Sequence, residues 1–385
     1  MEYELGELLP YEQPADYIVE STDYDDSYKT PVLTAGKSFI IGYTNETKGI
    51  YTKLPVIIFD DFTTSSQYVD FPFKVKSSAM KILSVNSEIA DLKYLFYKMQ
   101  TIQFDSANHK RYWISEYSKI KLDLPTLAEQ KRIVNRIETM FAKLDEAKEE
   151  AQSVLDSFET RKAAILHKAF SGQLRIDNEE LKIEDWEEKK LENVLIEKPR
   201  NGYSTTAVDY ETPYKTMSLS ATTSGYFRPE FYKYIEADIS DDSFLWLKPG
   251  DILIQRANSL DKVGTSAIYT GGEHEFIYPD LMMKLQVKES VSNAFIVYQL
   301  KTEESLAYFR NNATGTAGNM PKINQKTVCN LPIKLPPLNY QLSIVNFLDT
   351  VLEKESRAKE SASTVLDQIA LLKKSILARA FRGEL

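Results

Sequence analysis

Two long stretches of the chain carry apolar residues at alternating steps of four and three positions, one within 124–174 and one within 335–385. A 3.5-residue period over several heptads is typical of a coiled-coil seam, not of a helix lying on a globular core. The period is broken once in each stretch, by Arg161 and by Glu355. We therefore predict two long helices with a narrow apolar seam. The predicted seam residues are Ile133, Ile137, Met140, Leu144, Val154, Phe158, Ile344, Leu348, Val351, Val365, Ile369 and Leu372.

These two stretches are copies of one another. They align without a gap, and each begins at a Leu-Pro pair and ends in Ala-Phe-x-Gly-x-Leu. A residue before proline is driven out of the helical region, and glycine commonly ends a helix, so both signals mark helix boundaries. Two such seams in one chain most simply pair with each other, and an antiparallel pair would give internal pseudo-two-fold symmetry. The alternative is that each seam pairs with another chain.

Each predicted helix follows a segment long enough to fold as a domain. The predicted organisation is a globular segment at 1–123, a helix at 124–174, an acidic linker at 175–189, a second globular segment at 190–334 and a helix at 335–385. Both globular segments have matching short apolar strands followed by a short amphipathic helix. The strands are predicted at 54–59, 80–85, 250–255 and 283–287, and the helices at 92–99 and 294–300. The predicted fold class is α+β: two β-rich α/β domains separated by an antiparallel two-helix coiled coil.

Composition narrows the class of protein. The single cysteine, Cys329, excludes a disulfide framework and a multi-cysteine metal site, and we expect it to be a buried small hydrophobe. The sequence has no apolar run long enough for a membrane span and no basic segment typical of a secretory signal at its start. We therefore expect a cytoplasmic protein without a membrane partner.

The formal net charge of −9 argues at first against nucleic acid as a partner. Its distribution weakens that argument, because residues 1–26 hold nine acidic and no basic residues, which leaves 47 of each sign in the rest of the chain. Recognition of DNA requires a local basic face rather than a basic protein. The net charge excludes a generally adhesive DNA binder and leaves a selective one open.

Two globular segments on a paired-helix scaffold suit a target with two halves, such as double-stranded DNA. Several predicted loops carry suitable side chains, since Arg can read guanine, Asn can read adenine, and Lys, Ser and Thr suit phosphates. The alternative for each loop is an ordinary polar surface turn. The candidate DNA-binding residues are Thr64, Ser66, His109, Lys110, Arg111, Tyr112, Arg200, Asn201, Tyr203, Arg256, Asn258, Arg310, Asn319 and Lys322.

Motifs for catalysis and cofactor binding are absent from the sequence. It contains neither Gly-x-x-x-x-Gly-Lys-Ser/Thr nor Gly-x-Gly-x-x-Gly nor Gly-x-Ser-x-Gly. The three histidines, His109, His167 and His274, lie far apart without the spacing of metal ligands. We predict no catalytic, metal-binding or cofactor-binding residues in this chain.

The motifs resemble the specificity subunit of type I restriction-modification systems. The resemblance covers essentially the whole chain and is closest at 124–134, Leu-Pro-Thr-Leu-Ala-Glu-Gln-Lys-Arg-Ile-Val; the second copy departs from the pattern at Tyr340. Trp186 resembles the usual entry to a target-recognition domain, whereas residues 1–5 lack that tryptophan.

The resemblance implies a non-catalytic subunit in which each globular segment is a target-recognition domain for one half of a split DNA sequence. It implies as partners two methyltransferase subunits, which carry S-adenosylmethionine and methylate adenine, and motor/nuclease subunits, which use ATP and Mg. This chain would bind none of these cofactors. One alternative function is a coiled-coil adaptor without DNA readout, which would leave the two dissimilar, aromatic-rich globular segments unexplained. Another is a stand-alone nuclease or methyltransferase, but the sequence lacks the motifs of such enzymes.

Overall fold

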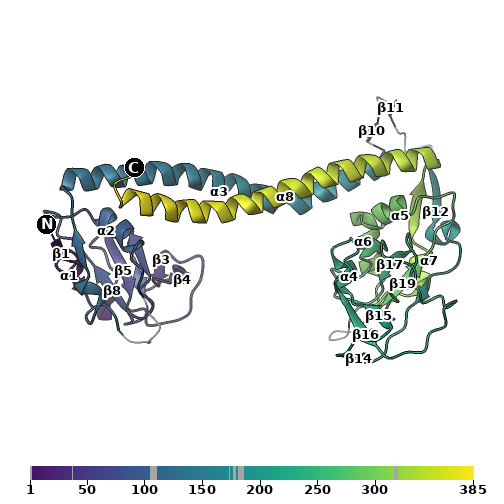
Figure 1. Cartoon of the computed structure of the whole chain (residues 1–385), viewed down its shortest axis with the longest axis horizontal. Coiled ribbons are helices and arrows are strands. Elements are labelled where there is room, and N and C mark those ends of the chain that lie inside the picture. The colour runs from purple at the N-terminus through teal and green to yellow at the C-terminus, as the bar shows by residue number, and fades with distance from the viewer. Residues whose placement is uncertain are drawn as a thin grey trace. The chain divides into compact units, whose positions relative to one another are not determined.

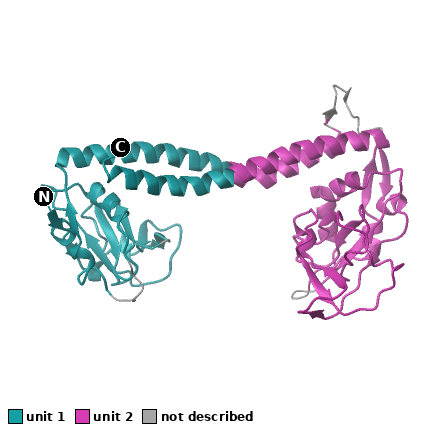
Figure 2. Cartoon of the chain, viewed as in Figure 1, with its two compact units in different colours: residues 1–153, 362–385 teal, residues 154–361 magenta. Residues whose placement is uncertain are grey.

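The computed structural model describes residues 2–36, 38–104, 111–172, 174–176, 179–180, 186–315 and 320–385. The chain divides into two compact units, the first made of residues 1–153 and 362–385 and the second of residues 154–361 (Figure 2). Each unit contains a globular part and a portion of both long helices. The fold class predicted from the sequence, α+β with two sheet-rich domains and long helices, is confirmed.

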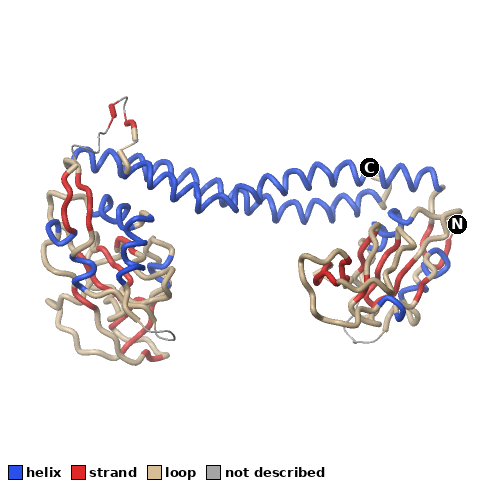
Figure 3. The backbone as a smooth tube through the Cα atoms, turned by 180° about the vertical axis from the view of Figure 1, so that it is seen from behind, coloured by secondary structure: helices blue, strands red, loops and turns tan. Residues whose placement is uncertain are grey.

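The two long helices are α3 (Leu127–Phe170) and α8 (Leu338–Ala380). Each starts three residues after the leucine of its Leu-Pro pair. In the second copy that leucine, Leu335, ends strand β20 (Pro332–Leu335) and is therefore extended. Each stops just before a glycine with positive φ, Gly172 or Gly383, a conformation that favours glycine over other residues. In each unit a portion of α3 lies beside a portion of α8 (Figures 1 and 3).

The pairing is antiparallel in both units. In the first unit Ile137 packs with Leu377 and Ala380, and Asp145 forms an ion pair with Lys373, so residue numbers rise along one helix as they fall along the other. In the second unit the same order is given by Glu159 with Lys359 and Arg161 with Glu355. The two seams therefore pair with each other within one chain.

Part of the predicted seam of α8 is wrong. Val365 and Leu372 are 36% and 48% exposed, whereas Leu366 and Lys373 are half-buried and continue the period set by Ala362 and Ile369. The apolar pattern does not predict Lys373 as a seam residue, because lysine is charged. In the structure the Lys373 ammonium lies 4.9 Å from the centroid of the Phe141 ring and pairs with Asp145, which allows its aliphatic stem to occupy the seam.

The remaining predicted seam residues face inward to different degrees. Ile137, Ile344, Leu348 and Ile369 are buried. The half-buried members are Ile133, Met140, Leu144, Val154, Phe158 and Val351.

The globular part of the first unit is built on the four-stranded antiparallel order β2-β8-β5-β6, next to the order β4-β3-β7 and the pair β1-β9. Val56 to Phe59 of the central strand are fully buried, as expected for a strand covered on both faces. The elements are β1 (Glu2–Glu4), α1 (Leu5–Leu8), β2 (Tyr11–Glu12), η1 (Ala15–Tyr17), β3 (Thr30–Leu33), β4 (Ile40–Thr44), β5 (Val56–Asp60), β6 (Ser66–Val69), β7 (Lys74–Val75), β8 (Met80–Leu83), α2 (Leu92–Met99), η2 (Tyr117–Lys119) and β9 (Lys121–Asp123).

The globular part of the second unit has a corresponding four-stranded order, β13-β19-β17-β18, beside β14-β16-β15 and the pair β12-β20. A short strand pair, β10 (Arg175–Ile176) and β11 (Glu179–Glu180), falls in the predicted linker. The other elements are β12 (Glu187–Lys190), η4 (Leu191–Val194), β13 (Arg200–Asn201), β14 (Ala207–Val208), β15 (Tyr214–Met217), α4 (Ser220–Thr223), β16 (Tyr232–Ile235), β17 (Ile252–Gln255), β18 (Ser266–Ile268), β19 (Met282–Leu285), α5 (Asn293–Leu300), α6 (Glu303–Asn312) and α7 (Gln325–Cys329).

A buried glutamine fastens the start of each long helix to the neighbouring short helix. In the first unit Gln130 donates through Nε2 to the carbonyl of Pro125 (2.9 Å) and accepts through Oε1 from the backbone N–H of Asp91 (2.9 Å). Asp91 is the N-cap of α2. This satisfies polar groups that would otherwise be buried without partners at two helix ends.

The second unit repeats this arrangement. Gln341 donates to the carbonyl of Pro336 (2.8 Å) and accepts from the backbone N–H of Ser292 (2.9 Å), the N-cap of α5. The glutamine of the repeated Leu-Pro motif therefore has the same structural role in both copies.

No helix in the described ranges combines the length and apolar character needed to cross a bilayer.

Candidate nucleic-acid interface

Three of the sequence-predicted loops in the second unit meet around the turn at 279–281. The backbone N–H of Tyr203 donates to the carbonyl of Tyr278 (2.9 Å), and that of Arg256 donates to the carbonyl of Leu281 (2.9 Å). Gly202 allows the close approach, because a Cβ there would lie 2.0 Å from the Tyr278 carbonyl oxygen. The third loop joins at Ala257, which bridges to Lys322. Segments far apart in the sequence thus form one polar surface.

One exposed part of this surface comes from β13 and the residues that follow it. Asn201 and Tyr203 are exposed. Arg200 lies 4.9 Å from the Phe244 ring centroid and pairs with Glu197 (2.6 Å), which fixes its guanidinium at the rim. An exposed amide, a phenol and an oriented guanidinium are suited to base edges and phosphates.

Arg256 and Asn258 are held more firmly than free surface side chains. Arg256 donates through Nη1 to the carbonyl of Asp280 (3.2 Å), while its buried Nε has no hydrogen-bond partner within the described part of the chain. Asn258 donates to Gln255 Oε1 (2.6 Å). Gln255 is buried and donates in turn to the carbonyl of Leu219 (2.8 Å). These side chains fix the shape of the surface.

Lys322 is exposed in a short ladder in which Thr314 and Lys322 exchange backbone hydrogen bonds of 2.8 and 2.9 Å. Asn319 lies outside the described residues. Arg310 is wrongly grouped with these residues, because it lies on α6 and pairs with Glu303 of the same helix.

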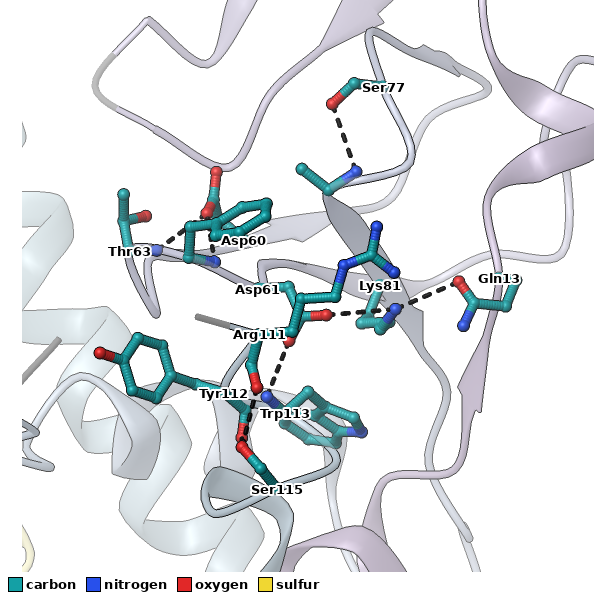
Figure 4. A network of polar contacts seen from close by, with 12 residues as sticks. Gln13, Asp60, Asp61, Thr63, Ser77, Lys81, Arg111, Tyr112, Trp113 and Ser115 are labelled. Atoms are coloured by element: carbon teal, nitrogen blue, oxygen red, sulfur yellow. Dashed lines mark hydrogen bonds and ion pairs between the residues drawn. The ribbon is translucent and has the colours of Figure 1, made fainter. Parts of the chain in front are cut away.

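In the first unit the segment that carries Arg111 and Tyr112 lies against Asp61, directly after β5 (Figure 4). The carbonyl and carboxylate of Asp61 accept from the backbone N–H groups of Tyr112 (2.8 Å) and Trp113 (2.7 Å). This anchors the segment that carries Arg111, which is exposed. Thr64 turns the chain between β5 and β6 with a φ of 59°.

The other four candidates in this unit have different outcomes. Ser66 accepts a hydrogen bond from Gln100 (2.8 Å). Tyr112 was expected to be a surface contact, but its side chain is 1% exposed and its ring packs edge-on against Phe104, so it is a core residue. A tyrosine in a polar loop gives no sequence signal of which way its ring points. His109 and Lys110 lie outside the described residues.

Arg111 and Lys322 occupy equivalent positions in the two units. They are 211 positions apart, as are Leu124 and Leu335 at the start of the repeats. Each is exposed and precedes a buried residue, Tyr112 or Ile323, whose backbone N–H donates to the carbonyl of the segment after the central strand. The acceptors are Asp61 and Arg256, at 2.8 Å in both cases. The duplication therefore presents a basic side chain at the same place twice.

A buried lysine that is absent from the predicted site residues lies on the strand next to each of these sites. Lys81 on β8 pairs with Asp61 (3.2 Å) and donates to Gln13 (3.1 Å), as Figure 4 shows. Lys284 on β19 lies 3.6 Å from Asp251 and donates to the Trp246 carbonyl (3.0 Å); burial lowers its pKa, against the opposing effect of Asp251. The sequence signal for these lysines is the Met-Lys pair that both matching strands share, Met80-Lys81 and Met283-Lys284.

The side chains of His167, His274 and Cys329 each contact or are buried among other residues of the fold. His167 pairs with Glu304 (2.8 Å), His274 stacks on Trp246, and burial raises the pKa of the Cys329 thiol. Among the residues that the structure describes, no group of three or more His, Cys, Asp or Glu side chains is arranged to hold a metal ion.

Comparison with known proteins agrees with the duplication. The family described as type I restriction modification DNA specificity domain matches residues 1–155 and 183–362. The specificity subunit of the Escherichia coli type I restriction enzyme EcoR124I/EcoR124II is 33% identical over 372 residues, covering 90% of this chain and 85% of that protein. The EcoKI specificity subunit of Escherichia coli K12 is 25% identical over 275 residues, covering 70% of this chain and 59% of that protein.

Two solved structures share the fold. A chain from a study of complex assembly and conformational transition of the type I R-M system superposes with a TM-score of 0.71 at 17% identity, covering 100% of this chain and 98% of the other. The HsdS subunit of Thermoanaerobacter tengcongensis gives a TM-score of 0.59 at 18% identity, covering 100% and 97%. With both halves matched by the family and a relative at 33% identity over most of its length, this chain belongs to the type I restriction-modification DNA specificity subunit family.

Proposed function

We propose that each unit reads one half of a split double-stranded DNA sequence and that the chain carries no catalytic step of its own. The observation that supports this most directly is the equivalence of Arg111 and Lys322, which lie at matching exposed positions in two halves of otherwise different loop sequence. Recognition of two unlike half-sites requires the same backbone arrangement in both units but different side chains on it. Base edges in the major groove would be read from these loops.

We further propose that the long helices bind methyltransferase subunits and, through them, motor and nuclease subunits. Helix α8 exposes Leu371 and Leu372 (66% and 48%) with Val365 in the first unit, and Leu338 and Leu342 in the second. Apolar side chains grouped on a helix that already has an internal partner mark a surface for a further protein. S-adenosylmethionine, ATP and Mg would be bound by those partners.

Mapping of methylated adenines tests this function. A strain carrying the complete system is compared with the same strain lacking this gene. The proposal predicts that methylation of one bipartite, asymmetric motif is lost on deletion and returns when the gene is restored. An unchanged methylation map would contradict it.

A further inference from the structure

The second unit contains a cavity of about 360 Å³ that the candidate DNA-reading loops do not line. Its wall is formed by α3, through Glu159 and Lys162, by the turn that follows α4, by the residues around the start of β18, and by Lys301 at the end of α5. Every residue that lines it belongs to the unit formed by residues 154–361.

The wall of this cavity carries three carboxylates and three lysines, but the carboxylates pair with bases other than Lys162 and Lys301. The three carboxylates of the wall each have a basic partner: Glu159 with Lys359 (3.8 Å), Asp261 with Lys262 (3.4 Å) and Glu303 with Arg310. Lys162 and Lys301 have no carboxylate within 4.0 Å in the ranges that the structure describes. Two ammonium groups at the cavity therefore lack a direct ion pair with a carboxylate of the described residues.

Lys301 is held by aromatic faces in place of a carboxylate. Its Nζ lies 4.5 Å from the Tyr226 ring centroid and 5.3 Å from that of Tyr298. Its stem passes Gly225, where a Cβ would lie 3.3 Å from Lys301 Cε. Burial, together with the charge of Lys162, lowers the pKa of Lys301 to about 8 against the opposing effect of Asp349. A buried ammonium without a counter-ion is costly and favours an anionic ligand.

A hydroxyl group at the same cavity also lacks a partner. Ser266 is 1% exposed, lines the cavity, and its Oγ makes no hydrogen bond to any described residue. The corresponding place in the first unit has a different pair of residues. Gln100, the C-cap of α2 as Lys301 is of α5, donates to Ser66 Oγ at 2.8 Å. The second unit thus has a charged residue and a free hydroxyl where the first has a neutral hydrogen-bonded pair.

We propose that this cavity binds a phosphoryl group, with Lys162 and Lys301 as its counter-charges and the Ser266 hydroxyl as a donor. A free or terminal phosphate dianion neutralises both ammonium groups and offers more acceptor positions than a carboxylate, whereas a backbone phosphodiester carries one charge and neutralises one of them. The phosphoryl group belongs either to the DNA backbone or to a free phosphate or nucleotide. The site does not depend on the proposed reading of two half-sites.

Calorimetric titration of the full chain with inorganic phosphate at about pH 7 tests the site. Lys301→Gln and Lys162→Gln are compared with Lys354→Gln, which removes an equal charge from an exposed position on α8 away from the cavity. Lys301→Gln introduces the residue that the first unit carries at this position, so we expect it to fold. We expect saturable phosphate binding that is at least tenfold weaker in the two cavity variants and unchanged in Lys354→Gln. Equal titrations for all four proteins would overturn the proposal.

A second arm distinguishes the two sources of the phosphoryl group. Binding of duplex DNA is measured over a range of salt concentrations for the wild type and Lys301→Gln. If the DNA backbone supplies the group, the slope of log affinity against log salt falls by about 0.9 in the variant, and inorganic phosphate competes with DNA. If a free phosphate or nucleotide fills the site, the DNA slope is unchanged while phosphate binding is still lost. Both results support the site, whereas phosphate binding that is unaffected by Lys301→Gln excludes it.

Discussion

Arg161 and Glu355, the two residues that interrupt the apolar seams of α3 and α8, lie opposite each other, with Arg161 Nε 2.8 Å from Glu355 Oε2. Arg161 also donates to Ser157 and to the Val154 carbonyl on its own helix. Both side chains are half-buried in the seam, so a slip of one helix along the other would separate the charges and leave them against apolar side chains. The pair selects one alignment of the two helices.

We predict that reversal of one charge, in Arg161→Glu or Glu355→Arg, lowers the free energy of unfolding by about 1–3 kcal/mol, and that the double reversal recovers most of the loss. Denaturant unfolding of the four proteins gives the coupling energy. The Glu159–Lys359 pair, 3.8 Å apart and more exposed, is the matched control, with an expected coupling near zero. Equal coupling for both pairs would show that the seam position of Arg161 has no special role.

The buried glutamines of the repeated motif give a prediction that separates the units. Gln341→Leu leaves the Ser292 N–H and the Pro336 carbonyl without their partner, and each unsatisfied group costs about 1–3 kcal/mol. We expect faster hydrogen exchange at Ser292 and in α5, with α2 unchanged. Gln130→Leu should have the reverse pattern, and exchange that rises equally in both helices would contradict the assignment.

Lys81 and Asp61 form a buried pair, with both side chains at most 1% exposed. Lys81→Met leaves the Asp61 carboxylate without a counter-charge in the core, so we predict a loss of about 3–5 kcal/mol in the free energy of unfolding. The double variant Lys81→Met/Asp61→Asn removes both charges and keeps an acceptor for the Trp113 N–H, and we expect it to be more stable than the single variant. Thermal and denaturant unfolding measure both, and a double variant that is no better would show that the lost charge is not the cause.

Much of this architecture is readable from the sequence, because the long helices are specified by local repetition. The heptad period, the Leu-Pro starts and the glycine stops give α3 and α8 to within a few residues, and the short helix α2 is predicted at 92–99 as found. The wrong predictions concern side chains whose burial differs from what is usual for their residue type. Lys373 enters the seam because Phe141 and Asp145 receive its ammonium, and Tyr112 enters the core despite its polar neighbours.

The candidate interface is less predictable, since it is assembled from the backbone contacts of distant segments. Nothing in the local sequence of Arg256 indicates that it lies beside Asp280 and Lys322. Such a surface is defined only once the strands are in register.

The exposed leucines of α8 provide a test of partner docking. We predict that Leu371→Glu/Leu372→Glu abolishes co-purification with the methyltransferase subunit while the melting temperature of the chain changes little, because both side chains are already in water. Lys374→Glu, on the same exposed stretch, changes charge without removing apolar surface and serves as the control. Retained assembly of the double variant would mean that the partner docks elsewhere.

The central claim is that each unit reads its own half of the target. Its most direct test is a selection experiment in which the assembled methyltransferase acts on a DNA library randomised in both half-sites, with Arg111→Ala and Asn201→Ala compared with the wild type. Both side chains are exposed, so neither change should disturb the fold. We predict that each variant loses about 1–3 kcal/mol of discrimination at one position, and that the two positions lie in opposite half-sites. Relaxation of both half-sites by either variant, or of the same half-site by both, would contradict the claim.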